Sequence, residues 1–153
     1  MRRSNNKNRI KVYRTMEGNI FEAVTAVIII VIWAIVLTKL KSMDGPVTFL
    51  SDEENNTSTR MIAGSIVATV LSLLFLVSAY FPDRMINMHI NVKNTAQYAL
   101  MIRMSRIMAV ETAVIFLGSI ANVGNDRSIY PALLAIALSV TLMIFRTLIK
   151  RKG

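Results

Sequence analysis

The 153-residue sequence contains no cysteine and a single histidine, His89. Without cysteine the chain forms no disulfide, no thiolate metal site and no cysteine nucleophile. A zinc site needs several ligands, so one histidine in a polar segment predicts no metal centre. Paired carboxylates deep in an apolar segment and a glycine-rich phosphate loop are also missing. The sequence therefore indicates a protein without catalysis, cofactor or metal.

Charge is scarce within long apolar segments, although the chain carries a net charge of +9. Hydrophobic residues make up 54% of the sequence and the mean hydropathy is +0.49. Residues 61–81 contain no charged side chain. As a helix this segment would measure about 32 Å, close to the roughly 30 Å hydrocarbon core of a bilayer. A helix that is apolar on every face is out of place in a small soluble domain, so we predict a membrane span.

Three further segments complete the prediction of an all-α fold, a four-span transmembrane helical bundle. The expected spans are 19–40, 61–81, 95–120 and 130–149. In lipid each segment has to be helical, because its backbone groups find hydrogen-bond partners only within the segment. A basic arm, 1–18, precedes the bundle, and a basic tail, 150–153, follows it. No small-residue cleavage pattern follows the first apolar run, which predicts an uncleaved signal anchor.

The basic residues predict the orientation. Four spans place both termini on one side, where the arm carries six basic residues against Glu17 and the tail carries three. The opposite side holds 39–60, with three basic and four acidic residues. The positive-inside rule therefore predicts cytoplasmic termini and a multi-pass protein of the inner (cytoplasmic) membrane. Basic residues at the ends of apolar runs indicate contact with the lipid bilayer and not with nucleic acid.

Ionisable residues inside the spans are the candidate functional residues, because burying them in a bilayer is costly. Arg103 and Arg106 lie in the first third of the third span and Glu111 lies near its middle. Glu22 and Arg146 enter from the same side of the membrane. We predict that these five residues form an intramembrane polar cluster. The arginines can extend to the interface, whereas Glu111, about 20 Å from the entry, is too deep to do so.

Glu111 has two interpretations at this point. It could be a proton-linked or ligand-linked site. It could equally be a neutral glutamate that holds two helices together through a hydrogen bond to Ser139 or Thr141, which lie at similar depth in the fourth span. A separate packing signal comes from Gly64, Ala68 and Ser72, whose four-residue spacing allows close approach of another helix. This spacing is also compatible with a homo-oligomer.

Two loops and the start of the third span contain a set of motif positions: Pro46, Phe49, Pro82, Asn87, Ala96, Gln97 and Tyr98. At these positions the chain resembles a family of small bacterial membrane proteins of unassigned function. These proteins carry the domain shared with the SdpI toxin-immunity protein. Thr48 stands where the family has a histidine, and Asp52 and Glu53 occupy the region of a family glycine. The resemblance implies an integral membrane protein linked to protection against a membrane-active toxin or to envelope signalling.

Two functions follow from these observations. The first is a non-enzymatic immunity-like or accessory protein that binds a membrane protein partner or a peptide toxin in the bilayer. The alternative is a small proton-linked transporter that uses Glu111. Small multidrug transporters also have four spans and one membrane glutamate, but theirs lies within the first span, whereas Glu22 lies at the edge of that span here.

Overall fold

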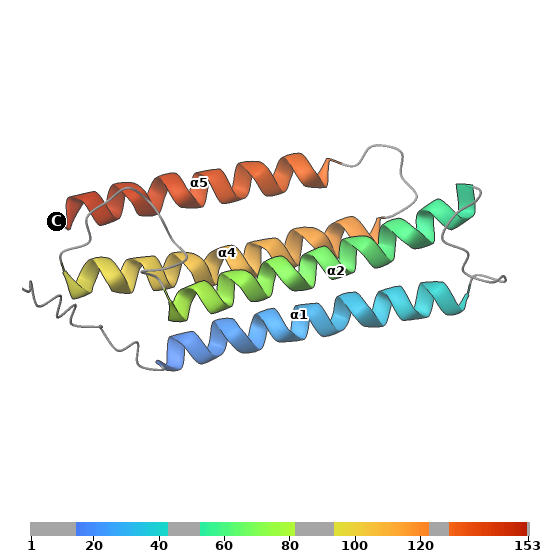
Figure 1. Cartoon of the computed structure of the whole chain (residues 1–153), viewed down its shortest axis with the longest axis horizontal. Helices are drawn as coiled ribbons and strands as arrows, with labels where there is room; N and C mark the ends of the chain where they lie inside the picture. The colour runs from blue at the N-terminus through green and yellow to red at the C-terminus, as the bar shows by residue number, and fades with distance from the viewer. Residues whose placement is uncertain (1–14, 43–52, 82–93, 123–128, 153) are drawn as a thin grey trace, which may run out of the picture.

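A computed structural model describes residues 15–42, 53–81, 94–122 and 129–152. Within these ranges the chain forms four helices and no strand, so the predicted all-α fold is confirmed. The helices are α1 (Met16–Lys41), α2 (Glu53–Tyr80), α4 (Thr95–Ala121) and α5 (Tyr130–Arg151) (Figure 1). The first and last helices begin and end close to the predicted spans. Helix α2 begins about two turns before residue 61, because no glycine or proline interrupts residues 53–60.

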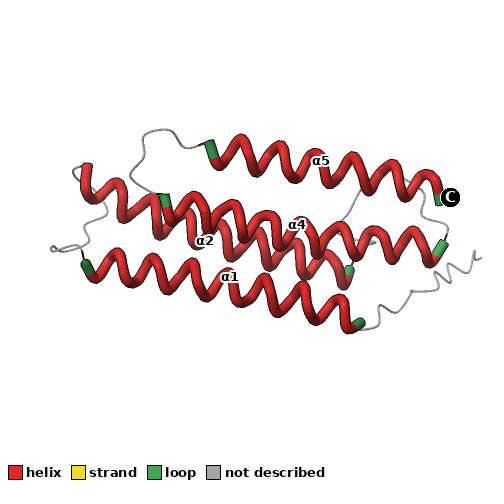
Figure 2. The backbone as a smooth tube through the Cα atoms, turned by 180° about the vertical axis from the view of Figure 1, so that it is seen from behind, coloured by secondary structure: helices red, strands yellow, loops and turns green. Residues whose placement is uncertain are grey.

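Consecutive helices run in opposite directions, so the start of α1 and the end of α5 lie at the same end of the bundle (Figures 1 and 2). Helix α4 packs against all three other helices. Helix α1 also packs against α2, whereas among the described helices α5 packs against α4 alone. The bundle is therefore a three-helix unit with α5 attached to one side of α4.

The interior of the three-helix unit combines large apolar side chains with small ones. Ile32 and Val36 of α1 are fully buried and pack in one cluster with residues of α2 and α4. On α2, Ala68 and Ser72 are also fully buried. Gly64 is only partly buried, and a Cβ added there would lie 3.9 Å from Ile120 Cγ1, an ordinary contact. The predicted small-residue face of α2 thus contributes buried residues to contacts inside the chain.

The outer surface is apolar along most of its length. Large hydrophobic side chains remain exposed on the outward faces of α1, α2 and α5, including Val27, Ile30, Leu73, Ile136 and Met143. Among the described residues, three helical segments are long and apolar enough to cross a membrane: Met16–Lys41, Thr57–Tyr80 and Tyr130–Arg151. This exterior indicates a membrane-embedded protein. Helix α4, which is not among the three, is the central helix and carries Arg103, Arg106 and Glu111.

Candidate functional site

The most buried charge described in the bundle is the guanidinium of Arg106, on the face of α4 that meets α1. The residue is only 3% exposed. Its Nη2 atom lies 3.8 Å from Oε1 of Glu22 on α1, which gives a partly buried ion pair without a short hydrogen bond. Neither Nε nor Nη2 of Arg106 has a hydrogen-bond partner. The positive charge of Arg106 is therefore compensated by Glu22, but two of its three nitrogen atoms donate no hydrogen bond.

Gly18 makes this placement of Arg106 sterically feasible. A Cβ atom on residue 18 would lie 2.3 Å from Nη2 and 2.4 Å from Cζ of Arg106. Only glycine therefore lets the guanidinium rest against the first turn of α1. This role could not be predicted from the sequence, because Gly18 falls at the end of the predicted basic arm. The only available signal was a glycine four residues before an acid at the start of an apolar run.

Tyr80 brings a third helix to the same site. Its hydroxyl, on the last residue of α2, donates a hydrogen bond to Oε1 of Glu22. A tyrosine at a span end is expected as an interfacial anchor. Here the hydroxyl also ties α2 to α1. Glu22 is thus the shared partner of one donor on α2 and one cation on α4.

Arg103 lies one turn earlier on α4, and its Nη2 atom donates to Oε2 of Glu17 on α1 at 2.8 Å. The two side chains are 55% and 44% exposed. An ion pair this exposed contributes little to stability. We define the inner triad as Glu22, Tyr80 and Arg106, and the outer pair as Glu17 and Arg103.

Glu111 lies apart from the inner triad, where α4 meets α5. The hydroxyl of Thr141 donates a hydrogen bond of 2.6 Å to its Oε1 atom. The other carboxyl oxygen, Oε2, is buried and has no hydrogen-bond partner. Of the two partners considered from the sequence, the structure thus selects Thr141, which is 7% exposed, while Ser139 faces outward.

The structure brings together three of the five residues predicted to form one polar cluster. Arg103, Arg106 and Glu22 lie along the contact between α1 and α4. Glu111 faces α5 instead. Arg146 is exposed on α5, and among the described residues it forms no ion pair with the others. All five residues lie within the predicted spans, but they lie on helix faces that point to different neighbours.

Helix ends are closed by side chains from neighbouring helices. Gln97, which is 2% exposed, donates from Nε2 to the carbonyl of Ile149 in the last turn of α5 at 2.9 Å. Asn94 donates to the carbonyl of Lys152 at 3.0 Å. At the opposite end of the bundle, Nζ of Lys39 contacts the final carbonyls of α4, those of Ile120 at 3.3 Å and Ala121 at 3.0 Å. These contacts satisfy carbonyls that a helix leaves open at its end.

The motif positions of the family resemblance are only partly described. Gln97 has the capping role given above, Tyr98 is half-buried and Ala96 is exposed. The other four positions, Pro46, Phe49, Pro82 and Asn87, lie outside the described residues, as do the basic arm up to residue 14 and His89.

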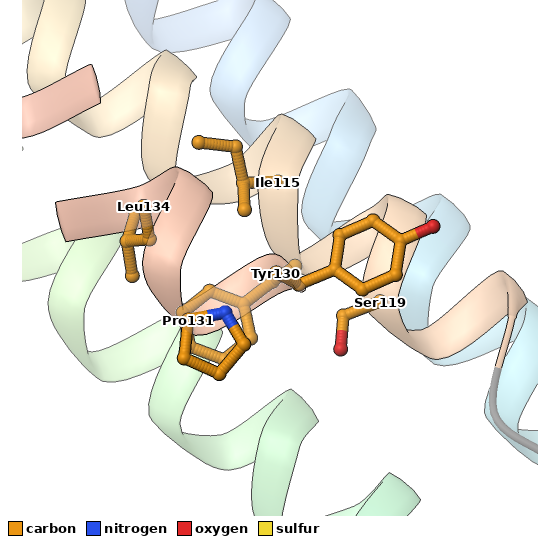
Figure 3. Close-up of a pocket in the computed structure, with 6 residues that line it drawn as sticks. Ile115, Ser119, Tyr130, Pro131 and Leu134 are labelled. Atoms are coloured by element: carbon orange, nitrogen blue, oxygen red, sulfur yellow. The ribbon is translucent and has the colours of Figure 1, made fainter. Parts of the chain in front are cut away.

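A cavity of about 150 Å³ opens between α4 and the start of α5. Figure 3 shows the side chains that line it, which are mainly apolar: Ile115, Phe116, Ser119, Tyr130, Pro131 and Leu134. The ring of Tyr130 packs over Gly118, where a Cβ would approach Cε1 to 2.9 Å. The cavity holds no acid, base or nucleophile pair, and the described residues contain no group of three or more potential metal ligands of the His, Cys, Asp or Glu type.

Comparison with protein-family models, with curated proteins and with solved structures finds no match to this chain. A proposal for its function therefore rests on the geometry and chemistry of the chain's own residues.

Proposed function

We propose that the chain is a four-span protein of the bacterial inner membrane with both termini in the cytoplasm. It acts without catalysis, as an immunity-like or envelope accessory or signalling protein that binds a partner within the bilayer. The partner is a membrane protein or a membrane-active peptide. Four spans require that α4 crosses the membrane together with the three apolar helices that surround it.

The contacts at the two ends of α4 support this crossing. Glu17 and Lys39 lie 22 residues apart on α1, a helical rise of about 33 Å, which matches the hydrocarbon core. Glu17 contacts Arg103 near one end of α4, and Lys39 contacts the carbonyls at its other end. Because Glu22 is the one charged residue of α1 between these two levels, the pairing of both ends of α4 with α1 supports a crossing of the same thickness by α4.

The distribution of basic residues supports cytoplasmic termini. Arg103, Arg106 and the basic residues 150–152 all belong to the end of the bundle where α1 starts and α5 finishes. The positive-inside rule assigns that end to the cytoplasm. Because the sequence has no cysteine, single introduced cysteines provide a direct test. A cysteine at Thr15 should be blocked only by a membrane-permeant thiol reagent, and one at Ser42 by an impermeant reagent as well. The reverse pattern would overturn the orientation.

The observation that carries the binding role is the contrast between a filled interior and an unpartnered apolar exterior. Inside, Ala68 and Ser72 of α2 and Ala109 and Ala113 of α4 are buried to 0% exposure. Small residues of this kind let helices approach closely and pack against one another. Outside, α5 contacts α4 alone among the described helices, and its outward side is a long apolar face available to lipid or to a partner.

A deletion strain tests the role directly. It should become sensitive to at least one agent in a panel of membrane-active peptides and cationic drugs. Wild-type protein and Glu111→Gln should both restore resistance if binding is the function, because glutamine keeps an acceptor for Thr141. Arg146→Gln, which alters an exposed arginine, is the matched control. If deletion changes neither sensitivity nor the abundance of any membrane protein, the binding role is wrong.

A small proton-linked transporter is the alternative, and Glu111 favours it. A carboxyl group with one oxygen bonded to Thr141 and the other buried without a partner is a group that could take up and release a proton. Purified protein in detergent should then release protons when a substrate is added, and Glu111→Gln should abolish the release. Rescue of the deletion strain by wild type but not by Glu111→Gln would favour transport over binding as the function.

A further inference from the structure

The cavity between α4 and the start of α5 lies at the end of the bundle opposite the start of α1 (Figures 1 and 3). Its volume is about 150 Å³. An engineered cavity of roughly this volume, lined by leucine, isoleucine and phenylalanine, stays dry and binds benzene. The space therefore fits a single six-membered ring, whereas most of a lipid acyl chain would remain outside it.

Two aromatic rings form part of the cavity wall. Phe116 of α4 lines the cavity and also packs against the apolar core of the three-helix unit, so its position is supported from the other side. Tyr130 contributes its ring from α5. Aromatic rings attract one another in offset or edge-to-face arrangements, in addition to the area that they bury. The wall thus favours an aromatic ligand over a saturated chain of the same volume.

The ring of Tyr130 is held in place by residues at the end of α4. The side-chain amide of Asn122 donates from Nδ2 to the Tyr130 hydroxyl at 2.7 Å and to the Gly118 carbonyl at 3.0 Å. The ring also needs a glycine beneath it, since a Cβ at residue 118 would lie 2.9 Å from its Cε1 atom. This part of the wall is therefore preformed, and a ligand need not order it on binding.

Ser119 supplies the cavity with a polar group. Of the two lining residues with a hydroxyl, Tyr130 is already bonded to Asn122, and Figure 3 shows its hydroxyl directed away from Ile115 and Leu134. A serine hydroxyl has one donor and two acceptor sites, so it keeps an acceptor site even when it donates to its own helix. Oγ of Ser119 can therefore accept a hydrogen bond from a ligand in the cavity.

We propose that this cavity binds a small uncharged aromatic molecule dissolved in the bilayer, of the size of benzene or phenol. Its ring packs against Phe116 and Tyr130, and a phenol hydroxyl donates to Oγ of Ser119. The described residues that line the cavity include no charged side chain, which disfavours an ionic ligand. Val114 and Leu133, on the exposed surfaces of α4 and α5, are apolar, so the ligand reaches the site through lipid. The site is separate from Glu111 and from the binding of a partner.

Fluorine NMR tests this binding with two probes, fluorobenzene and para-fluorophenol, added to the full chain in lipid nanodiscs. Empty nanodiscs of the same lipid composition report partitioning of the probes into the bilayer. The full chain should give an additional, saturable change of the fluorine signal that benzene reverses. Leu134→Trp places a ring of the chain itself in the cavity and should remove this change. Leu133→Trp, at a neighbouring residue that is 44% exposed, is the matched control and should retain it.

The two probes together test the polar group of the site. Ser119→Ala should weaken the binding of para-fluorophenol about fivefold, as expected for the loss of one neutral hydrogen bond. The binding of fluorobenzene, which has no hydroxyl, should stay the same. Equal weakening of both probes would contradict a hydrogen bond from the ligand to Ser119.

A signal no different from that of empty nanodiscs would overturn the proposal, because lipid alone would then fill the cavity. A saturable change that Leu134→Trp retains would also overturn it, because the probes would then bind elsewhere. Thermal melting reports whether each variant folds. If Leu134→Trp does not fold, Gly118→Ala displaces the Tyr130 ring and should weaken both probes, whereas Gly64→Ala, whose new Cβ makes an ordinary contact, should weaken neither.

Discussion

The inner triad and the Glu111–Thr141 pair place ionisable groups at two depths of α4, and they are held in different ways. Arg106 is paired with an opposite charge, and residues from three helices meet around it. Glu111 accepts a hydrogen bond from the Thr141 hydroxyl of α5, and of the helices that the structure describes, α5 packs against α4 alone. A buried charge left alone is far more costly than an unpaired neutral group. In the inner triad, where three helices meet, the charge of Arg106 is compensated by Glu22. At the deeper site, Glu111 has only the hydrogen bond from Thr141.

Removing the acid of the inner triad should have the largest effect. Glu22→Ala leaves the buried guanidinium of Arg106 without its carboxylate and the Tyr80 hydroxyl without its acceptor. We expect a loss of about 3 kcal/mol in unfolding free energy, measured by denaturant titration in mixed micelles. Adding Arg106→Leu to Glu22→Ala should recover part of the loss, because the unpaired charge is then gone. A double variant less stable than Glu22→Ala would contradict the ion-pair explanation.

Filling the space at Gly18 should be the next largest effect. Gly18→Ala forces the guanidinium of Arg106 away from α1, at a cost of about 1–2 kcal/mol. Gly64→Ala is the matched control, since its new Cβ would make only an ordinary contact with Ile120. Thermal melting of the two variants should separate them clearly. Equal melting temperatures would mean that Arg106 can adopt another position without loss.

The deeper pair should be weaker. Thr141→Val removes the hydroxyl that joins α5 to Glu111 and should cost about 0.6 kcal/mol, the average for hydrogen bonds between membrane helices. Ser139→Ala, on the exposed side of α5, should change stability by less than about 0.5 kcal/mol. If Thr141→Val instead destabilised the bundle as much as Glu22→Ala, the contrast between the two sites would disappear.

The outer pair should show the smallest effect. Arg103→Gln removes an ion pair in which both side chains are about half exposed, and we expect a change of at most about 0.5 kcal/mol. The change should shrink further as salt is added, because screening weakens exposed pairs. A loss of more than about 1 kcal/mol in unfolding free energy that does not change with salt would be typical of a buried pair. It would show that this pair is more enclosed than its exposure indicates.

The sequence predicted features that depend on position along a helix. The all-α fold follows from the length and apolar character of the segments. Spacing predicted a packing face of Gly64, Ala68 and Ser72, of which Ala68 and Ser72 are fully buried. Depth left Ser139 and Thr141 open as partners of Glu111, and the structure pairs Glu111 with Thr141. Whether α4 crosses the membrane stays a prediction, together with the orientation of the termini.

Features that depend on which faces meet could not be predicted. Gly18 and Arg106 lie far apart in the sequence, and neither segment indicates that the helix face with Gly18 packs against the face with Arg106. The position of Tyr80 at a span end is fully explained by an interfacial role, and no further sequence feature predicted its hydrogen bond to Glu22. Arg146 has suitable depth, but the outward face of α5 keeps it from the cluster. Rotation about the helix axis is decided by packing of the whole bundle, which a single-sequence pattern leaves undetermined.

The contacts that close the helix ends bear on how the protein is made. The final carbonyls of α4 are met by Lys39 of α1, and those of α5 are met by Gln97 and Asn94 at the start of α4. In both cases the capping residue precedes the helix end that it completes. A chain leaving the ribosome from its N-terminus therefore carries each cap before the carbonyls that need it are synthesised. The ends of α4 and α5 can thus be capped in the order of translation, because neither depends on a residue that is synthesised later.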